Sequence, residues 1–148
     1  MNRILVAVDG SPAALNAVDF AADLANKYEA ELVLLTVVAD LSPGVDPAFE
    51  EYARIEHIPE PATQLAFATA ESVLGRARSE ARAKGASRIS AGPSVGDPAK
   101  EIIAAAEDRQ VDLIVVGSHG HGRLAGLLLG SVAQKVVSLA SCPVAVVR

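Results

Sequence analysis

Residues 4–38 read ILVAVDGSPAALNAVDFAADLANKYEAELVLLTVV and contain the unit on which the rest of the architecture is built. The stretch begins and ends with apolar runs, at residues 4–8 and 32–38, that are rich in β-branched residues and lack polar alternation, as in strands buried on both faces. Between these runs, apolar side chains recur every three or four residues, and Ser11 and Pro12 stand as N-cap and first residue of a helix. The stretch therefore predicts a strand, a helix and a second strand parallel to the first.

The remaining sequence repeats this alternation of helices and strands. The patterns predict helices at about residues 63–84, 98–109 and 131–140 and strands at residues 88–95, 113–116 and 144–147. Pro93 cannot donate to a strand ladder, which places its strand at a sheet edge, and in the last helix we expect both Val136 and Val137 to face the sheet. Because right-handed crossovers between parallel strands place helices on both faces of a sheet, we expect an α/β fold with five parallel strands in the order 3-2-1-4-5 and four helices.

The length of 148 residues indicates a single domain over residues 1–148. Most predicted connections are short, but residues 40–62 form a long, proline-rich one around a predicted helical turn at residues 49–54. Connections of this length are usually functional or mobile.

Composition and charge exclude several functional classes. Hydrophobic residues make up 51% of the chain, so a packed core can form, and no run approaches the 18 apolar residues that a membrane span needs. Thirteen Lys and Arg against 18 Asp and Glu leave a net charge of -5, and aromatic residues are only 3%, which argues against a nucleic-acid partner. The single Cys142 forms no internal disulfide and no zinc site, so we expect a reducing, cytoplasmic location.

The chemistry is concentrated at residues 117–131, GSHGHGRLAGLLLGS, which follow the fourth predicted strand. Ligands of open parallel sheets bind at the carboxyl ends of the strands. Gly117 and Gly120 would let main chain approach a phosphate, and Gly130 and Ser131 open a helix whose N–H groups and dipole favour an anion. On spacing alone, a surface loop before a capped helix stays an equal alternative.

Of two better-known phosphate motifs, one is excluded and the other is disfavoured. A Walker P-loop needs a Lys before its Ser or Thr, but Ser131 directly follows Gly130. The dinucleotide fingerprint should follow the first strand, where residues 9–12 read DGSP instead.

The spacing Gly117-x2-Gly120-x9-Gly130-Ser131 resembles the nucleotide signature of the universal stress protein family, whose ATP-binding members carry Gly-x2-Gly-x9-Gly followed by Ser or Thr. The resemblance extends to segments along the whole chain except residues 40–62. It implies an adenine nucleotide alpha hydrolase-like fold and a stress-response role. It also implies ATP as the ligand, with AMP or cyclic AMP as alternatives, and Mg²⁺ or Mn²⁺ bound together with the nucleotide.

The same resemblance implies a set of ligand-binding residues. For the adenosine part of the ligand these are Ala7, Asp9 and the main chain of Val37. For the ribose and phosphates they are Gly117, Gly120, Gly130, Ser131 and Val132. No catalytic residue and no dedicated metal site are expected. An alternative is that Asp9 has only a structural role, in which its carboxylate caps the first helix.

The leading interpretation is a regulatory ATP-binding module. An efficient phosphotransferase needs a positioned base and a Lys or Arg clamp, and the loop offers only glycines, serines, two His and one Arg, Arg123, which we expect to be solvated. One alternative is a slow ATPase, or a phosphotransferase that phosphorylates itself on Ser118 or Ser131. Another is an interaction protein that works without ATP. His119 and His121 lack a third ligand and make a poor metal site, so we expect them to be loop residues able to touch phosphate.

The last predicted strand, Val144–Val147, is apolar and lies at a sheet edge in the expected order. An open apolar edge invites pairing with another chain. The family resemblance likewise implies a homodimer formed through this strand.

Overall fold

The computed structural model describes residues 1–39, 61–121 and 129–148, and within them every predicted strand and helix forms within two residues of its expected ends. The elements in chain order are β1 (Arg3–Ala7), α1 (Pro12–Tyr28), β2 (Glu31–Val38), α3 (Pro61–Ala83), β3 (Ile89–Val95), α4 (Pro98–Asp108), β4 (Leu113–Gly117), α5 (Ser131–Leu139) and β5 (Val144–Val147). The helical turn predicted at residues 49–54 lies outside the described residues.

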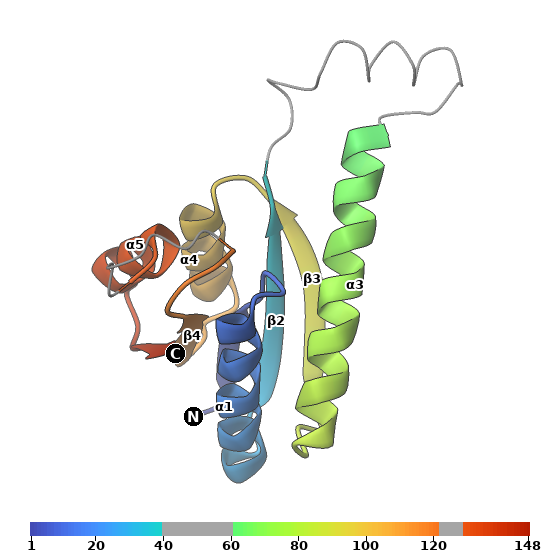
Figure 1. Cartoon of the computed structure of the whole chain (residues 1–148). Helices are drawn as coiled ribbons and strands as arrows, with labels where there is room; N and C mark the ends of the chain where they lie inside the picture. The colour runs from blue at the N-terminus through green and yellow to red at the C-terminus, as the bar shows by residue number, and fades with distance from the viewer. Residues whose placement is uncertain (40–60, 122–128) are drawn as a thin grey trace.

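The five strands form one parallel sheet in the order β3-β2-β1-β4-β5, which confirms the predicted topology. Helices α1 and α3 cover one face of the sheet, and α4 and α5 cover the other (Figure 1). The chain runs outward from β1 through β2 to β3 and then returns to β4 on the other side of β1. The carboxyl ends of β1 and β4 therefore flank the topological switch point, where open α/β sheets bind ligands.

The strands divide their side chains between two hydrophobic layers. In β1, Ile4 and Val6 pack toward α1 and α3, whereas Leu5 packs toward α4 and α5, and all three are fully buried. The expectation for α5 is half right, because Val136 is fully buried but Val137 is 47% exposed. At 100° per residue, the stripe of α5 that faces the sheet contains Ala133 and Val136 and leaves the next residue outside.

Local capping fixes where the helices begin. The Ser11 hydroxyl accepts a hydrogen bond from the Ala14 N–H at 3.2 Å, and Asp97 accepts one from the Lys100 N–H at 3.1 Å. Helices α1, α4 and α5 each follow the carboxyl end of a strand, so their N-termini gather at the same edge of the sheet. Among the described residues, no helix is long and apolar enough to cross a membrane.

Candidate functional site

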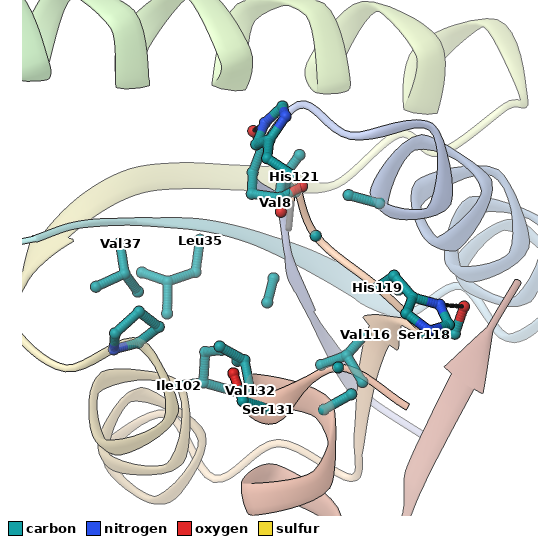
Figure 2. Close-up of a pocket in the computed structure, with 18 residues that line it drawn as sticks. Val8, Leu35, Val37, Ile102, Val116, Ser118, His119, His121, Ser131 and Val132 are labelled. Carbon is teal, nitrogen blue, oxygen red and sulfur yellow. Dashed lines mark hydrogen bonds between the residues drawn. The ribbon is translucent and has the colours of Figure 1, made fainter. Parts of the chain in front are cut away.

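A cavity of about 310 Å³ opens at the carboxyl edge of the sheet, between the ends of β1, β2 and β4 and the starts of α4 and α5 (Figure 2). Its volume lies within the range of small-molecule sites. The residues that line it are Ala7, Val8, Asp9, Ala14, Leu35, Val37, Pro98, Ile102, Val116, Gly117, Ser118, His119, Gly120, His121, Gly130, Ser131, Val132 and Ala133. All eight candidate binding residues from the sequence are among them, although they come from four separate segments of the chain.

One end of the cavity is apolar. Leu35 and Val37 reach it from β2 and Ile102 reaches it from α4, with Val132 of α5 nearby (Figure 2). Pro98, the first residue of α4, also lines the cavity. The sequence predicted only Val37 and Val132 as site residues in this group. The sequence pattern indicates that Ile102 faces inward from its helix. Whether Ile102 lies beside the cavity depends on how α4 packs on the sheet.

The opposite end is formed by the loop after β4, which is tied into the fold by main-chain hydrogen bonds. The Ser118 N–H donates to the Val147 carbonyl at 2.6 Å, and the Gly130 N–H donates to the Ser118 carbonyl at 2.7 Å. Ser118 is only 3% exposed, and its Oγ lies 3.1 Å from Nδ1 of His119. Through these hydrogen bonds the loop is held to the end of β5 and to the start of α5.

Asp9 is exposed at the end of β1, and its carboxylate Oδ1 accepts a hydrogen bond from the Ser11 N–H at 2.9 Å. The helix cap itself is the Ser11 side chain, so Asp9 organises the turn before α1 rather than capping the helix. Its second oxygen, Oδ2, lies over Gly120, where an added Cβ would come within 2.5 Å of it.

The signature glycines also have packing reasons that involve no ligand. A Cβ on Gly117 would lie 2.8 Å from the main-chain carbon of Ala13 and 2.9 Å from the nitrogen of Ala14, which is closer than side chains approach. A Cβ on Gly130 would meet the Ser118 carbonyl oxygen at 3.3 Å, a milder contact. Glycine at residue 117 is thus required by the close approach of the α1 main chain, whereas at residue 120 a Cβ would displace only the exposed carboxylate of Asp9.

The three helix N-termini near the cavity differ in how their N–H groups are satisfied. Helices α1 and α4 carry side-chain caps, whereas Gly130 begins α5 without one, and Ser131 to Ala133 line the cavity. The pKa of Asp97, the cap of α4, is lowered mainly by the hydrogen bond from the Lys100 main chain, with the ammonium of Lys135 3.6 Å away. The uncapped, positive end of the α5 dipole is therefore the terminus best suited to an anion.

The two loop histidines lie on different walls of the cavity. His119 contacts Ser118 beside β4, while Nε2 of His121 lies 2.6 Å from the main-chain oxygen of Asp9, on the side of α1 (Figure 2). Within residues 1–39, 61–121 and 129–148, no group of three or more His, Cys, Asp or Glu side chains comes together as a metal site. Arg123, the one Arg of this loop in the sequence, lies outside the described residues.

Comparisons with known proteins agree on one family. The sequence model of the Universal stress protein family matches residues 1–148. Universal stress protein YxiE of Bacillus subtilis is 36% identical over 149 residues, covering 99% of each chain, and a universal stress protein of Methanocaldococcus jannaschii is 35% identical over 147 residues, covering 99% of this chain and 81% of its own.

Solved structures give the same result. Universal stress protein UspA from Lactobacillus plantarum superposes with a TM-score of 0.81 at 30% identity, covering 99% of this chain and 97% of its own. A universal stress protein crystallised in complex with cAMP superposes with a TM-score of 0.71 at 29% identity, covering 99% of this chain and 96% of its own.

Proposed function

Because the chain belongs to the universal stress protein family, we propose that it binds an adenine nucleotide in the cavity at the carboxyl edge of its sheet and acts as a regulatory module. The observation that carries this proposal is the convergence of eight residues, matched one by one to the family's nucleotide site, on a single cavity. The relative solved in complex with cAMP supports an adenine nucleotide as the ligand class. ATP is the nucleotide implied by the resemblance of the glycine spacing to the signature of the family's ATP-binding members.

The apolar end of the cavity suits the base. The Leu35 carbonyl accepts a hydrogen bond from the Val8 N–H at 2.8 Å, so the main chain of Leu35 faces β1. Two residues later, Val37 faces the same side, but β1 has already ended at Ala7. The N–H and carbonyl groups of Val37 are therefore directed past the end of β1, where a base edge could pair with both. The apolar side chains of Leu35 and Ile102 would cover the base faces.

The loop after β4 and the first residues of α5 form the part of the cavity that suits the phosphates. The N–H groups at the start of α5 point toward an approaching anion, and the hydroxyl of Ser131 adds a donor. A divalent cation would be held mainly by the nucleotide's own phosphates. The oxygen donors that line the cavity, the Asp9 carboxylate and the hydroxyls of Ser118 and Ser131, fit Mg²⁺ or Mn²⁺, which prefer oxygen ligands.

The chemistry of the described lining residues supports regulation rather than rapid turnover. Their ionisable groups are Asp9, His119 and His121, and none is a Lys or Arg that could clamp a transferring phosphoryl group. A slow reaction stays the alternative, favoured by the contact between Ser118 Oγ and His119 Nδ1, which pairs a hydroxyl with a base. Transfer of label from γ-labelled ATP to the protein, lost in Ser118→Ala, would select that alternative.

The remaining parts of the proposal concern organisation. Residues 1–148 form one universal stress protein domain, two copies of which pair through β5, and the protein works in the cytoplasm. Support for the pairing comes from the position of β5 at the sheet edge opposite the proline-containing β3.

The test of nucleotide binding is calorimetric titration of nucleotide-stripped protein with ATP and Mg²⁺, comparing wild type, Gly130→Glu and Gly130→Ala. The alanine variant is the matched control, since its Cβ makes only the 3.3 Å contact with the Ser118 carbonyl. We expect the carboxylate of Gly130→Glu to repel the phosphates and abolish binding, while Gly130→Ala retains most of it. A wild type that binds no adenine nucleotide would refute the proposal, and equal losses in both variants would attribute the effect to packing.

A further inference from the structure

Three contacts join the loop after β4 to the turn between β1 and α1. Nε2 of His121 lies 2.6 Å from the main-chain oxygen of Asp9, and the Ser11 hydroxyl donates to the His119 carbonyl at 3.4 Å. The third is the packing of Gly120 beneath the Asp9 carboxylate. The shortest of the hydrogen bonds thus comes from His121, which lies outside the glycine signature.

The direction of the His121 bond follows from its partner. A main-chain carbonyl can only accept, so Nε2 of His121 donates, and both the neutral Nε2–H tautomer and the imidazolium can do so. The ring fits beside the turn without strain, since even a Cβ on Gly10 would lie 3.9 Å from Nε2.

We infer that His121 is a positioning residue, which holds the 117–121 loop against the β1–α1 turn so that the cavity is formed before the nucleotide enters. This inference rests on the proposed function. The bond joins two walls of the cavity, since Asp9, Gly120 and His121 all line it. Without the bond, the ligand would have to order the loop on binding, and that cost would appear as weaker affinity and faster release.

The test compares wild type with His121→Ala and His121→Gln. Alanine removes the donor, whereas the glutamine amide nitrogen can reach the position of Nε2 and restore it. Because His121 is exposed, both variants should fold, and coincident unfolding transitions would establish this. The measurements are affinity for ATP with Mg²⁺, the nucleotide dissociation rate, and hydrogen exchange of the loop amides in the unliganded protein.

In His121→Ala we expect affinity to fall about tenfold, mainly through faster dissociation, as the loss of one hydrogen bond predicts. Loop amides should exchange faster even without ligand, and His121→Gln should restore all three properties. Unchanged affinity and exchange in His121→Ala would overturn the inference and leave the proposed function standing. Weaker affinity with unchanged exchange would also overturn it, because His121 would then act by touching the ligand. A wild type that binds no adenine nucleotide would overturn the proposed function and this inference together.

Discussion

Gly117 shows at the scale of a single residue that one sequence feature can serve packing and binding together. Because residue 117 has no Cβ, the first turn of α1 can pack directly against it. A Cβ there would lie only 2.8 Å from the main-chain carbon of Ala13. In the same region the Ser11 hydroxyl donates to the His119 carbonyl, and Ala14 and Gly117 both line the cavity. A glycine at this position therefore carries information about the fold whether or not a phosphate binds, and the signature spacing alone does not separate the two roles.

We predict that Gly117→Ala destabilises the protein by about 1–3 kcal/mol, because the contacting atoms belong to main chain and cannot rotate away. Gly92→Ala is the matched control in β3, where a Cβ would meet nothing within 4 Å. Its free energy of unfolding should stay near that of wild type. Chemical denaturation of the three proteins measures the difference, and equal stability of the two variants would show that α1 can shift to admit the methyl group.

At the scale of helices and strands, the boundaries that local chemistry determines were the most predictable. Ser11 and Pro12 at the start of α1, and Asp97 and Pro98 at the start of α4, act through main chain only a few residues away. The outward position of Val137 was missed because it depends on the angle at which α5 lies on the sheet.

The β5 edge has a definite pattern of inward and outward main-chain groups. The Pro143 carbonyl accepts from the Ile114 N–H, and the Val147 carbonyl accepts from the Ser118 N–H. In this register, Pro143, Ala145 and Val147 face β4. Val146, lying between two inward-facing residues, directs its N–H away from the sheet. Val144 has the same outward orientation, so the N–H groups of Val144 and Val146 are the donors that a second chain would use.

We predict that Val146→Pro gives a monomer with a folded core, since proline removes an outward donor and no bond to β4. Ala145→Pro is the control, because it places proline at an inward-facing position and should destabilise the fold itself. Light scattering measures the mass of each protein, and thermal unfolding measures its stability. A dimeric, stable Val146→Pro would place the interface elsewhere on the surface.

For the molecule as a whole, strand order and the location of the cavity followed from the sequence because alternating elements allow few topologies. The eight site residues came from the family spacing, and the structure gathers them at one cavity. Leu35 and Pro98 went unassigned because their place beside the cavity depends on the packing of α4 on β2. The bond from His121 to Asp9 was likewise invisible, since it joins residues 112 positions apart.

Acid should destabilise the whole fold through carboxylates that tie its elements together. Hydrogen bonds from the Asn2 and Arg3 N–H groups lower the pKa of Asp112, and the Ser90 hydroxyl, followed by the Arg3 guanidinium, lowers the pKa of Glu31. The folded state then binds fewer protons than the unfolded chain, so this stability is complete above about pH 5 and is lost as pH falls through and below about pH 4. The Asn side chain of Asp112→Asn can still accept a hydrogen bond but cannot titrate. The thermal unfolding midpoint of this variant should therefore depend less steeply on pH than that of wild type. Parallel midpoint curves for the two proteins between pH 3 and 6 would exclude Asp112 as a source of the acid sensitivity.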